Sequence, residues 1–231
     1  MAKPNGAILW QGPSAIDGNP IAVIVTGLAS VSSNTKTGAM LQTWILRTDI
    51  EPHAAVKAGD DASICGACVH RPSLGSDDAP CYVKTFQAPL AVYRAFHRGN
   101  YPDWSDLDEY PLQGTINRLG SYGDPGAVPE HVWSRYTLDS KGYTGYSHQW
   151  QDRPDLKPYC MASVDSREER DLAMSQGWRT FRVGVKGDTA DPCEVLCPAS
   201  KEAGNRTTCA KCKLCAGTTS KSKKSVFIPA H

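Results

Sequence analysis

The stretch "PYCMASVDSREERDLAMSQGWRTFRVGV", residues 158–185, carries the clearest structural pattern in this 231-residue chain. Apolar residues at 159–164 predict a buried strand. Asp165 and Ser166 follow with side-chain oxygens suited to capping a helix, which two glutamates in its first turn and a closing glycine also favour. A second apolar stretch at 179–185 predicts the next strand. The segment is therefore expected to fold as strand, helix and strand.

The same alternation of short strands, polar loops and helices extends back to residue 114 and is typical of βα units around a parallel sheet. Farther upstream, the β-branched stretches 21–27 and 41–49 flank a polar loop and predict an N-terminal β-hairpin. We therefore predict an α/β fold whose parallel sheet forms a partial or complete TIM-barrel-like βα barrel. Residues 1–192 would form this body, and residues 193–231 a cysteine-rich basic tail packed on it.

Polar residues follow the predicted strands, and function in such folds gathers at the carboxyl ends of strands. Because carboxylates and imidazoles are the usual general acids and bases, we predict catalytic roles for Asp124, His148 and Asp165. Arginine binds phosphate well, so nearby polar groups are candidates for holding a substrate. These substrate-binding candidates are Arg118, Ser121, Gln149 and Arg182. Structural roles are the alternatives: Asp165 as a helix cap, Arg182 in an ion pair and His148 as a buried, hydrogen-bonded histidine.

Five of the nine cysteines crowd into residues 193–215 with the spacing C-x3-C-x11-C-x2-C-x2-C. Thiolates two residues apart can reach one metal centre from a single turn, so this pattern favours metal binding. An upstream C-x2-C-x12-C stretch adds three thiols, with His70 as a substitute ligand. One division into two four-ligand centres joins Cys197, Cys209, Cys212 and Cys215 in one, and Cys65, Cys68, Cys81 and Cys193 in the other. Cys160 is expected to be a buried, inert thiol in a strand.

The redox compartment bears on what the cysteines do. The amino-terminal stretch has no long apolar core, and no apolar run approaches the roughly 20 residues of a membrane span, so we predict a cytoplasmic protein. Disulfides are rare in the cytoplasm, and an odd number of cysteines cannot all pair. The thiols are then expected to hold a [4Fe–4S] cluster or Zn²⁺, and the spacing alone leaves both open.

Charge is distributed unevenly along the chain. Residues 201–224 carry seven lysines and arginines against one glutamate, a net charge of +6, whereas the whole chain is +1. The remainder is therefore acidic. A basic tail on an acidic body favours a polyanionic partner, so we predict contact with a nucleic acid or nucleotide, with solvated lysines as the alternative.

Sequence stretches along nearly the whole chain together resemble an uncharacterised family of bacteriophage and prophage proteins. They are "CGACVHRP", "RLGSYGDPGAVP", "GYSHQW", "MASVDSREERDLAMSQGWRTFRV" and "CPASKEAGNRTTCAKCKLCAG". The family has no established activity, so the resemblance implies a setting, the host cell cytoplasm, and no reaction. The cysteine element ahead of "RLGSYGDP" is also similar to that of phage radical-SAM-like barrel proteins, although their C-x3-C-x2-C loop is missing. This second similarity favours an iron–sulfur cluster over zinc.

Three classes of function are compatible with these patterns. The first is an enzyme that acts on a nucleotide or nucleic acid through the residues at the strand ends. The second is a non-enzymatic nucleic-acid-binding or host-inhibitory protein whose metal sites are structural. The third is a redox or cluster-sensing switch. The sequence does not define the oligomeric state.

Overall fold

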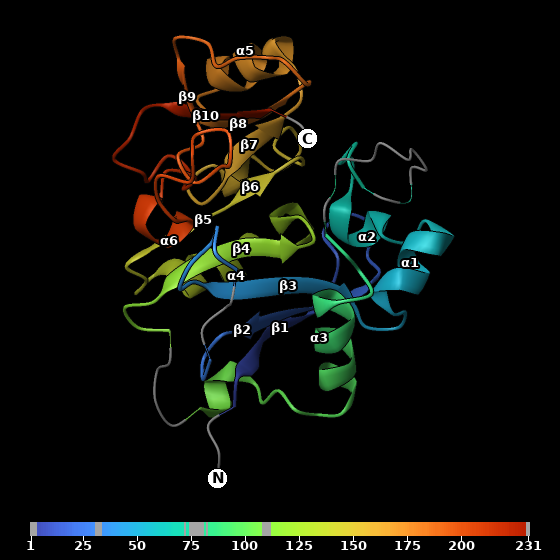
Figure 1. Cartoon of the computed structure of the whole chain (residues 1–231). Coiled ribbons are helices and arrows are strands. Elements are labelled where there is room, and N and C mark those ends of the chain that lie inside the picture. The colour runs from blue at the N-terminus through green and yellow to red at the C-terminus, as the bar shows by residue number, and fades with distance from the viewer. Residues whose placement is uncertain are drawn as a thin grey trace.

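In a computed structural model, the chain forms two five-stranded β-sheets with helices packed around them (Figure 1). The structure describes residues 4–30, 34–71, 73, 81, 83–107 and 112–229. The first sheet has the strand order β1-β2-β3-β4-β5 and is mixed, whereas the second, β6-β7-β8-β10-β9, is parallel throughout. The predicted α/β class is confirmed. The predicted barrel is not, because the strands divide between two sheets.

The bounds of the elements are as follows. The first sheet contains β1 (Gly6–Pro13), β2 (Pro20–Thr26), β3 (Leu41–Arg47), β4 (Ile116–Tyr122) and β5 (Gly142–Thr144). The second contains β6 (Tyr146–Ser147), β7 (Met161–Val164), β8 (Thr180–Gly184), β9 (Glu194–Leu196) and β10 (Ser225–Pro229). The helices are α1 (Pro52–Ala58), α2 (Ala62–Cys65), α3 (Ala88–His97), α4 (Glu130–Thr137), α5 (Arg167–Ser175) and α6 (Cys209–Cys212), with 3-10 turns η2 (Trp104–Asp106), η3 (Pro125–Ala127) and η4 (Pro154–Leu156). None of the described helices is long and apolar enough to cross a lipid bilayer.

The predicted N-terminal pair of strands is present as β2 and β3, which run antiparallel with Ile24 opposite Trp44. Strand β1, which the sequence reading did not identify, pairs antiparallel with the other edge of β2. Strand β3 then pairs in parallel with β4, where the predicted βα units begin. The first sheet is mixed for this reason.

Gly145 forms the corner between the two sheets, because β5 and β6 lie on either side of it but belong to different sheets. Its N–H donates to the carbonyl of Cys215 at 2.8 Å, and its own carbonyl accepts from the N–H of Met161 at 2.9 Å. A Cβ at this position would lie 3.0 Å from the Sγ of Cys160 and 3.1 Å from the Cβ of Leu119. Only glycine fits this corner without displacement of its neighbours.

Residues 158–185 fold as predicted into strand, helix and strand, with α5 packed over β7 and β8 (Figure 1). Ser166 is the N-cap: its Oγ accepts the N–H of Glu169 at 3.1 Å. The carboxylate of Glu169 accepts the N–H of Asp165 at 2.8 Å in return. Because Ser166 caps the helix, the carboxylate of Asp165 is available for other contacts.

The C-terminal tail is part of the second sheet. Strand β10 lies between β8 and β9 and is parallel to both, so the predicted boundary after residue 192 falls inside a sheet. Residues 197–224 connect β9 to β10 and contain the short helix α6. This segment lies over the face of the second sheet opposite α5 (Figure 1), where Met161, Val226 and Cys197 form an apolar cluster.

Arg182, a predicted substrate-binding residue, is instead a buried structural residue. Its guanidinium donates to the carboxylate of Glu194 at 2.8 and 2.7 Å and also to Asp188. The side chains of Arg182 and Glu194 are 1% and 0% exposed. These contacts give Arg182 the alternative role of an ion pair, because the chain from β8 to β9 folds back and brings Asp188 and Glu194 onto the arginine.

Removing one member of this buried ion pair should destabilise the fold. We expect Arg182→Ala to lower the free energy of unfolding by about 3–5 kcal/mol, because Glu194 would keep a buried charge without a partner. Urea unfolding followed by circular dichroism measures the change. Lys186→Ala, which removes an exposed cation after the same strand, should leave stability within about 0.5 kcal/mol. Equal stability of the two variants would contradict the assigned role.

Candidate functional site

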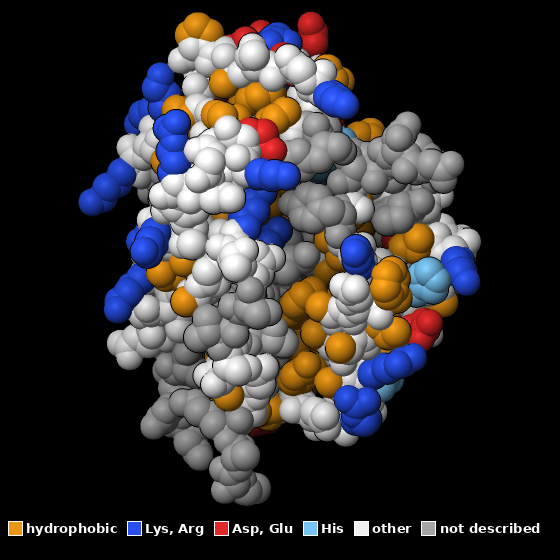
Figure 2. Space-filling view, in the orientation of Figure 1, with side chains coloured by type: hydrophobic (Ala, Val, Ile, Leu, Met, Phe, Trp, Pro, Cys, Tyr) orange, Lys and Arg blue, Asp and Glu red, His pale blue; other side chains and the backbone are white. Residues whose placement is uncertain are grey.

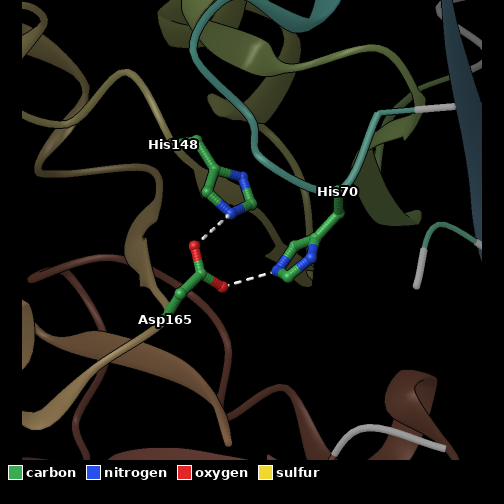
Figure 3. Close-up of side chains that lie close together, drawn as sticks. All are labelled: His70, His148 and Asp165. Atoms are coloured by element: carbon green, nitrogen blue, oxygen red, sulfur yellow. Dashed lines mark hydrogen bonds and ion pairs between the residues drawn. The ribbon is translucent and has the colours of Figure 1, made fainter. Parts of the chain in front are cut away.

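Two histidines and an aspartate meet at the carboxyl ends of the strands (Figure 3). Asp165 follows β7, His148 follows β6 and His70 lies in the turns after α2. The Nε2 atom of His70 lies 2.5 Å from Oδ1 of Asp165, and Nε2 of His148 lies 3.4 Å from Oδ2. One ligand atom from each residue lies within 4.8 Å of the other two, and all three side chains are half-buried. We call this group the His–Asp site.

The His–Asp site is strongly polarised. Burial lowers the pKa of His148, but its hydrogen bonds to Asp165 and Cys68 outweigh this effect and raise the pKa to about 10. Burial acts to raise the pKa of Asp165, whereas its hydrogen bonds with His148 and His70 hold that pKa well below its usual value. A metal cation that binds His148 must therefore displace a proton.

Asp124 lies next to this site, but its carboxylate is already occupied. Oδ1 accepts from the hydroxyl of Ser147 at 2.5 Å and the N–H of Gly126 at 2.7 Å, and Oδ2 accepts from the N–H of His148 at 2.7 Å. Burial raises the pKa of Asp124, and the positive charge of His148 opposes the rise. The structure thus brings Asp124 and His148 together as expected, but it gives Asp124 a positioning role in place of the predicted catalytic one.

Gln149, a predicted substrate-binding residue, braces the cysteine turn. Its side-chain amide donates to the carbonyl of Cys65 at 3.1 Å and accepts the N–H of Ala67 at 3.2 Å. Gly66 between them has a φ of 54°, and a Cβ there would lie 2.4 Å from the amide of Gln149. The side chain of Gln149 thus holds the cysteine turn through both ends of its amide.

Cys65, Cys68 and Cys81 lie beside the His–Asp site and are called the cysteine triad. All three thiols are unpaired. Burial raises the pKa of Cys65 well above its usual value, and the charges of Cys68, Asp61, Asp124 and Cys81 raise it further, so these groups are neighbours. The Sγ of Cys68 lies 4.0 Å from Nε2 of His148, which joins the triad to the His–Asp site.

Cys193, predicted as the fourth ligand of this set, lies elsewhere. It precedes β9, at the amino end of the strands, where its carbonyl accepts the N–H of Ser225. Burial lowers the pKa of Arg170 on α5, whereas Asp191, Asp171 and the thiolate of Cys193 raise it, so Cys193 lies close to that helix. Cys193 therefore lies apart from the cysteine triad, whereas His148 lies 4.0 Å from Cys68.

Buried polar atoms without a partner surround the cysteine triad. Both carboxylate oxygens of Asp61, the hydroxyl of Tyr122 and the Nε and Nη1 of Arg71 have no hydrogen-bond partner. Arg71 Nη1 lies 3.6 Å from Asp61 Oδ1, too far for a good hydrogen bond. Each such atom costs about 1–3 kcal/mol unless something satisfies it. Atoms of this kind mark a place where a bound ion, ligand or water completes the site.

Cys197, Cys209, Cys212 and Cys215 form a second group, called the thiolate centre. Burial raises the pKa of Cys215 far above its usual value, and the charges of Cys197, Cys209 and Cys212 raise it further. All four thiols are therefore neighbours, as in the predicted division. Among the described residues, no three cysteine sulfurs lie within 4.8 Å of one another, so these thiols are spaced more widely than the ligand atoms of the His–Asp site.

The remaining predicted substrate ligands lie outside the His–Asp site. Arg118 Nη2 donates to the hydroxyl of Tyr146 at 3.3 Å, and its charge opposes the effect of burial, which raises the pKa of Cys209. Arg118 therefore faces the thiolate centre. Ser121 donates its hydroxyl to Oε1 of Gln42 at 2.7 Å, a contact within the first sheet. Neither residue adjoins the two histidines.

The sequence reading noted His70 only as a substitute metal ligand. Its position two residues after Cys68 was the only indication that His70 belongs to a site. Nothing in the sequence spacing indicates that the turn containing His70 contacts Asp165 at the end of β7. In comparisons with known proteins, the chain matches no family model, no curated protein and no solved structure.

The positioning role of Asp124 predicts a loss of stability on its removal. Asp124→Ala leaves three buried donors without an acceptor, so we expect the free energy of unfolding to fall by about 3 kcal/mol or more. Urea unfolding of Asp139→Ala, which removes an exposed carboxylate, provides the control. A stable Asp124→Ala protein would remove the proposed link between β4 and the backbone of His148.

Proposed function

We propose that this protein is a metal-dependent enzyme that acts on a nucleotide or nucleic acid. Its active site comprises His70, His148 and Asp165, which bind a divalent metal ion, and its thiolate centre holds a [4Fe–4S] cluster. The observation that carries the proposal is the convergence of two imidazoles and a carboxylate within 4.8 Å at the carboxyl ends of parallel strands. Such strand ends are where enzymes of this class keep their reactive groups.

Imidazole and carboxylate ligands suit first-row transition metals and zinc. A divalent ion held by His70, His148 and Asp165 would keep positions open for water or substrate and would supply Lewis-acid chemistry for hydrolysis. Asp124 holds the backbone of His148, and the carboxylate of Asp165 lies between the Nε2 atoms of the two imidazoles. Cys68, 4.0 Å from His148, is within reach as a further ligand.

Four thiolates can bind a [4Fe–4S] cluster, each on a different iron, and they also suit a single zinc ion. We propose the cluster because Cys209, Cys212 and Cys215 form a C-x2-C-x2-C run, which is frequent in cluster-binding proteins. The positive charges of Lys36 and Arg118 beside Cys209 would offset the charge of the thiolates.

A nucleotide or nucleic acid is the proposed substrate because of the charge around the C-terminal segment. Lysine and arginine side chains gather over this segment along the left margin of Figure 2, where no acidic side chain is visible. Residues 201–224 carry the net charge of +6 noted above. The same surface favours a second candidate, a non-enzymatic nucleic-acid-binding or host-inhibitory protein with structural metal sites. The resemblance to phage proteins fits both and remains a prediction.

Loss of a ligand at the His–Asp site should abolish tight binding of a divalent ion. Co²⁺ titrated into the protein, with its thiolate centre filled, should give visible absorption bands and bind to one site. We expect Asp165→Asn and His70→Gln to weaken binding beyond the roughly 10- to 100-fold that loss of an outer-shell partner costs. His97→Gln, which changes an exposed histidine on α3, should bind Co²⁺ like the parent protein.

Two outcomes separate the candidates. Absence of Co²⁺ binding to the parent protein would leave the two histidines as an acid–base pair and remove the metal from the mechanism. Binding that survives Asp165→Asn but is lost with Cys65→Ser would move the ion to the cysteine triad.

The thiolate centre makes a separate prediction about metal content. Protein purified without oxygen should contain iron with matching sulfide and a broad absorbance near about 400 nm, as expected of a thiolate-held cluster. Cys212→Ser should lose iron and sulfide and destabilise the C-terminal segment, because cluster binding and folding are coupled. Cys193→Ser, which lies outside both groups, should keep them. Stoichiometric zinc would indicate a structural zinc site, and thiols oxidised in pairs would exclude a metal centre.

A further inference from the structure

A basic pocket of about 380 Å³ lies away from the His–Asp site, between the segment that leads into β3 and the turn that leads into α6. Its lining residues are Thr35, Lys36, Asn205, Arg206, Thr207, Thr208 and Lys211. Two parts of the chain separated by about 170 positions thus build one concave surface.

The pocket carries three cations and no carboxylate. Lys36 is half-buried, while Arg206 and Lys211 are exposed, and all three line the cavity. Within the part of the chain that the structure describes, no ion pair joins any of the three to a carboxylate. Three like charges around one cavity repel one another, so an anion of matching charge would relieve an unfavourable arrangement.

The backbone holds the two walls of the pocket together. The carbonyl of Lys36 accepts the N–H of Cys209 at 2.9 Å, and that of Thr37 accepts the N–H of Ala210 at 3.0 Å. Asn34 Oδ1 accepts the N–H of Lys36 at 3.0 Å and fixes that turn. The cations therefore project from a braced framework, which lowers the entropy lost when a ligand binds.

We propose that this pocket binds the phosphate groups of a nucleotide or of a nucleic-acid strand. Guanidinium and ammonium groups are the side chains that recognise phosphate, and the hydroxyls of Thr35 and Thr207 with the amide of Asn205 supply further donors. The volume lies within the general range of ligand pockets. The proposal rests on the substrate class of the proposed function and names a site for it. The pocket is separate from the His–Asp site and adjoins the thiolate centre through Lys36.

The test uses full-length protein in two charge-matched forms. The pocket variant is Lys36→Gln/Arg206→Gln/Lys211→Gln, and the control is Lys201→Gln/Lys221→Gln/Lys223→Gln, which removes three exposed cations of the tail outside the cavity. Inorganic phosphate, ATP and a fluorescent single-stranded oligonucleotide are titrated into each form over a range of salt. Thermal unfolding and metal content confirm that both forms are folded and loaded.

We expect the pocket variant to bind ATP or the oligonucleotide at least tenfold more weakly than the control. With the oligonucleotide, the slope of log affinity against log salt should fall by roughly 2 in the pocket variant, since three phosphate contacts are lost. If ATP binds and inorganic phosphate competes with it, but the oligonucleotide does not bind, the pocket is a site for a free nucleotide. If the oligonucleotide binds but ATP does not, the pocket is a site for a nucleic-acid strand.

Equal loss of affinity in the pocket and control variants would overturn the proposal, because the cations would then act only through net charge. Absence of binding by any probe to the parent protein would overturn it as well. If the metal content of both variants is unchanged, a loss of binding reflects the pocket and not the loss of a metal centre.

Discussion

The arrangement of the molecule depends on the corner at Gly145. One peptide there ends the first sheet and begins the second, and its N–H and carbonyl bond to Cys215 and Met161. The corner thus ties together the mixed sheet, the parallel sheet and the segment that carries the thiolate centre. A side chain at this position would contact Cys160 and Leu119 closely, so the packing at the corner favours glycine.

This corner also determines which residues share a site. His148 follows β6 and lies three residues after the corner. Its backbone N–H donates to Asp124, which follows β4, and its ring contacts Asp165, which follows β7. The parallel sheet brings the carboxyl ends of its strands to one edge, and the turns after α2 close over that edge with His70 and Cys68. The two carboxylates therefore have different contacts. Asp124 holds the backbone of His148, and Asp165 contacts the two imidazole rings.

Local pattern predicted much of this arrangement. The apolar strands, the cap at Ser166 and the order of strands and helices were predictable from the sequence. The structure also brings Asp124, His148 and Asp165 close together. The partners that decide each residue's role were not readable. Asp124 is satisfied by donors 23 and 24 positions away, and Arg182 by a carboxylate on a later strand. Cys193 matches a ligand spacing, yet it lies at the amino ends of the strands, because it immediately precedes β9 in a parallel sheet.

That order of strands affects how the chain assembles. In the described sheet, β9 has β10 as its only neighbour, and β10 is also the partner that completes β8. During synthesis, residues 194–196 leave the ribosome well before residues 225–229, so β9 must wait without a strand to pair with. The second sheet can close only after the intervening loop, with its four thiols, is wholly outside the exit tunnel. Until then the edge of β8 that will pair with β10 is exposed, and it is the surface on which a stalled chain would associate with others.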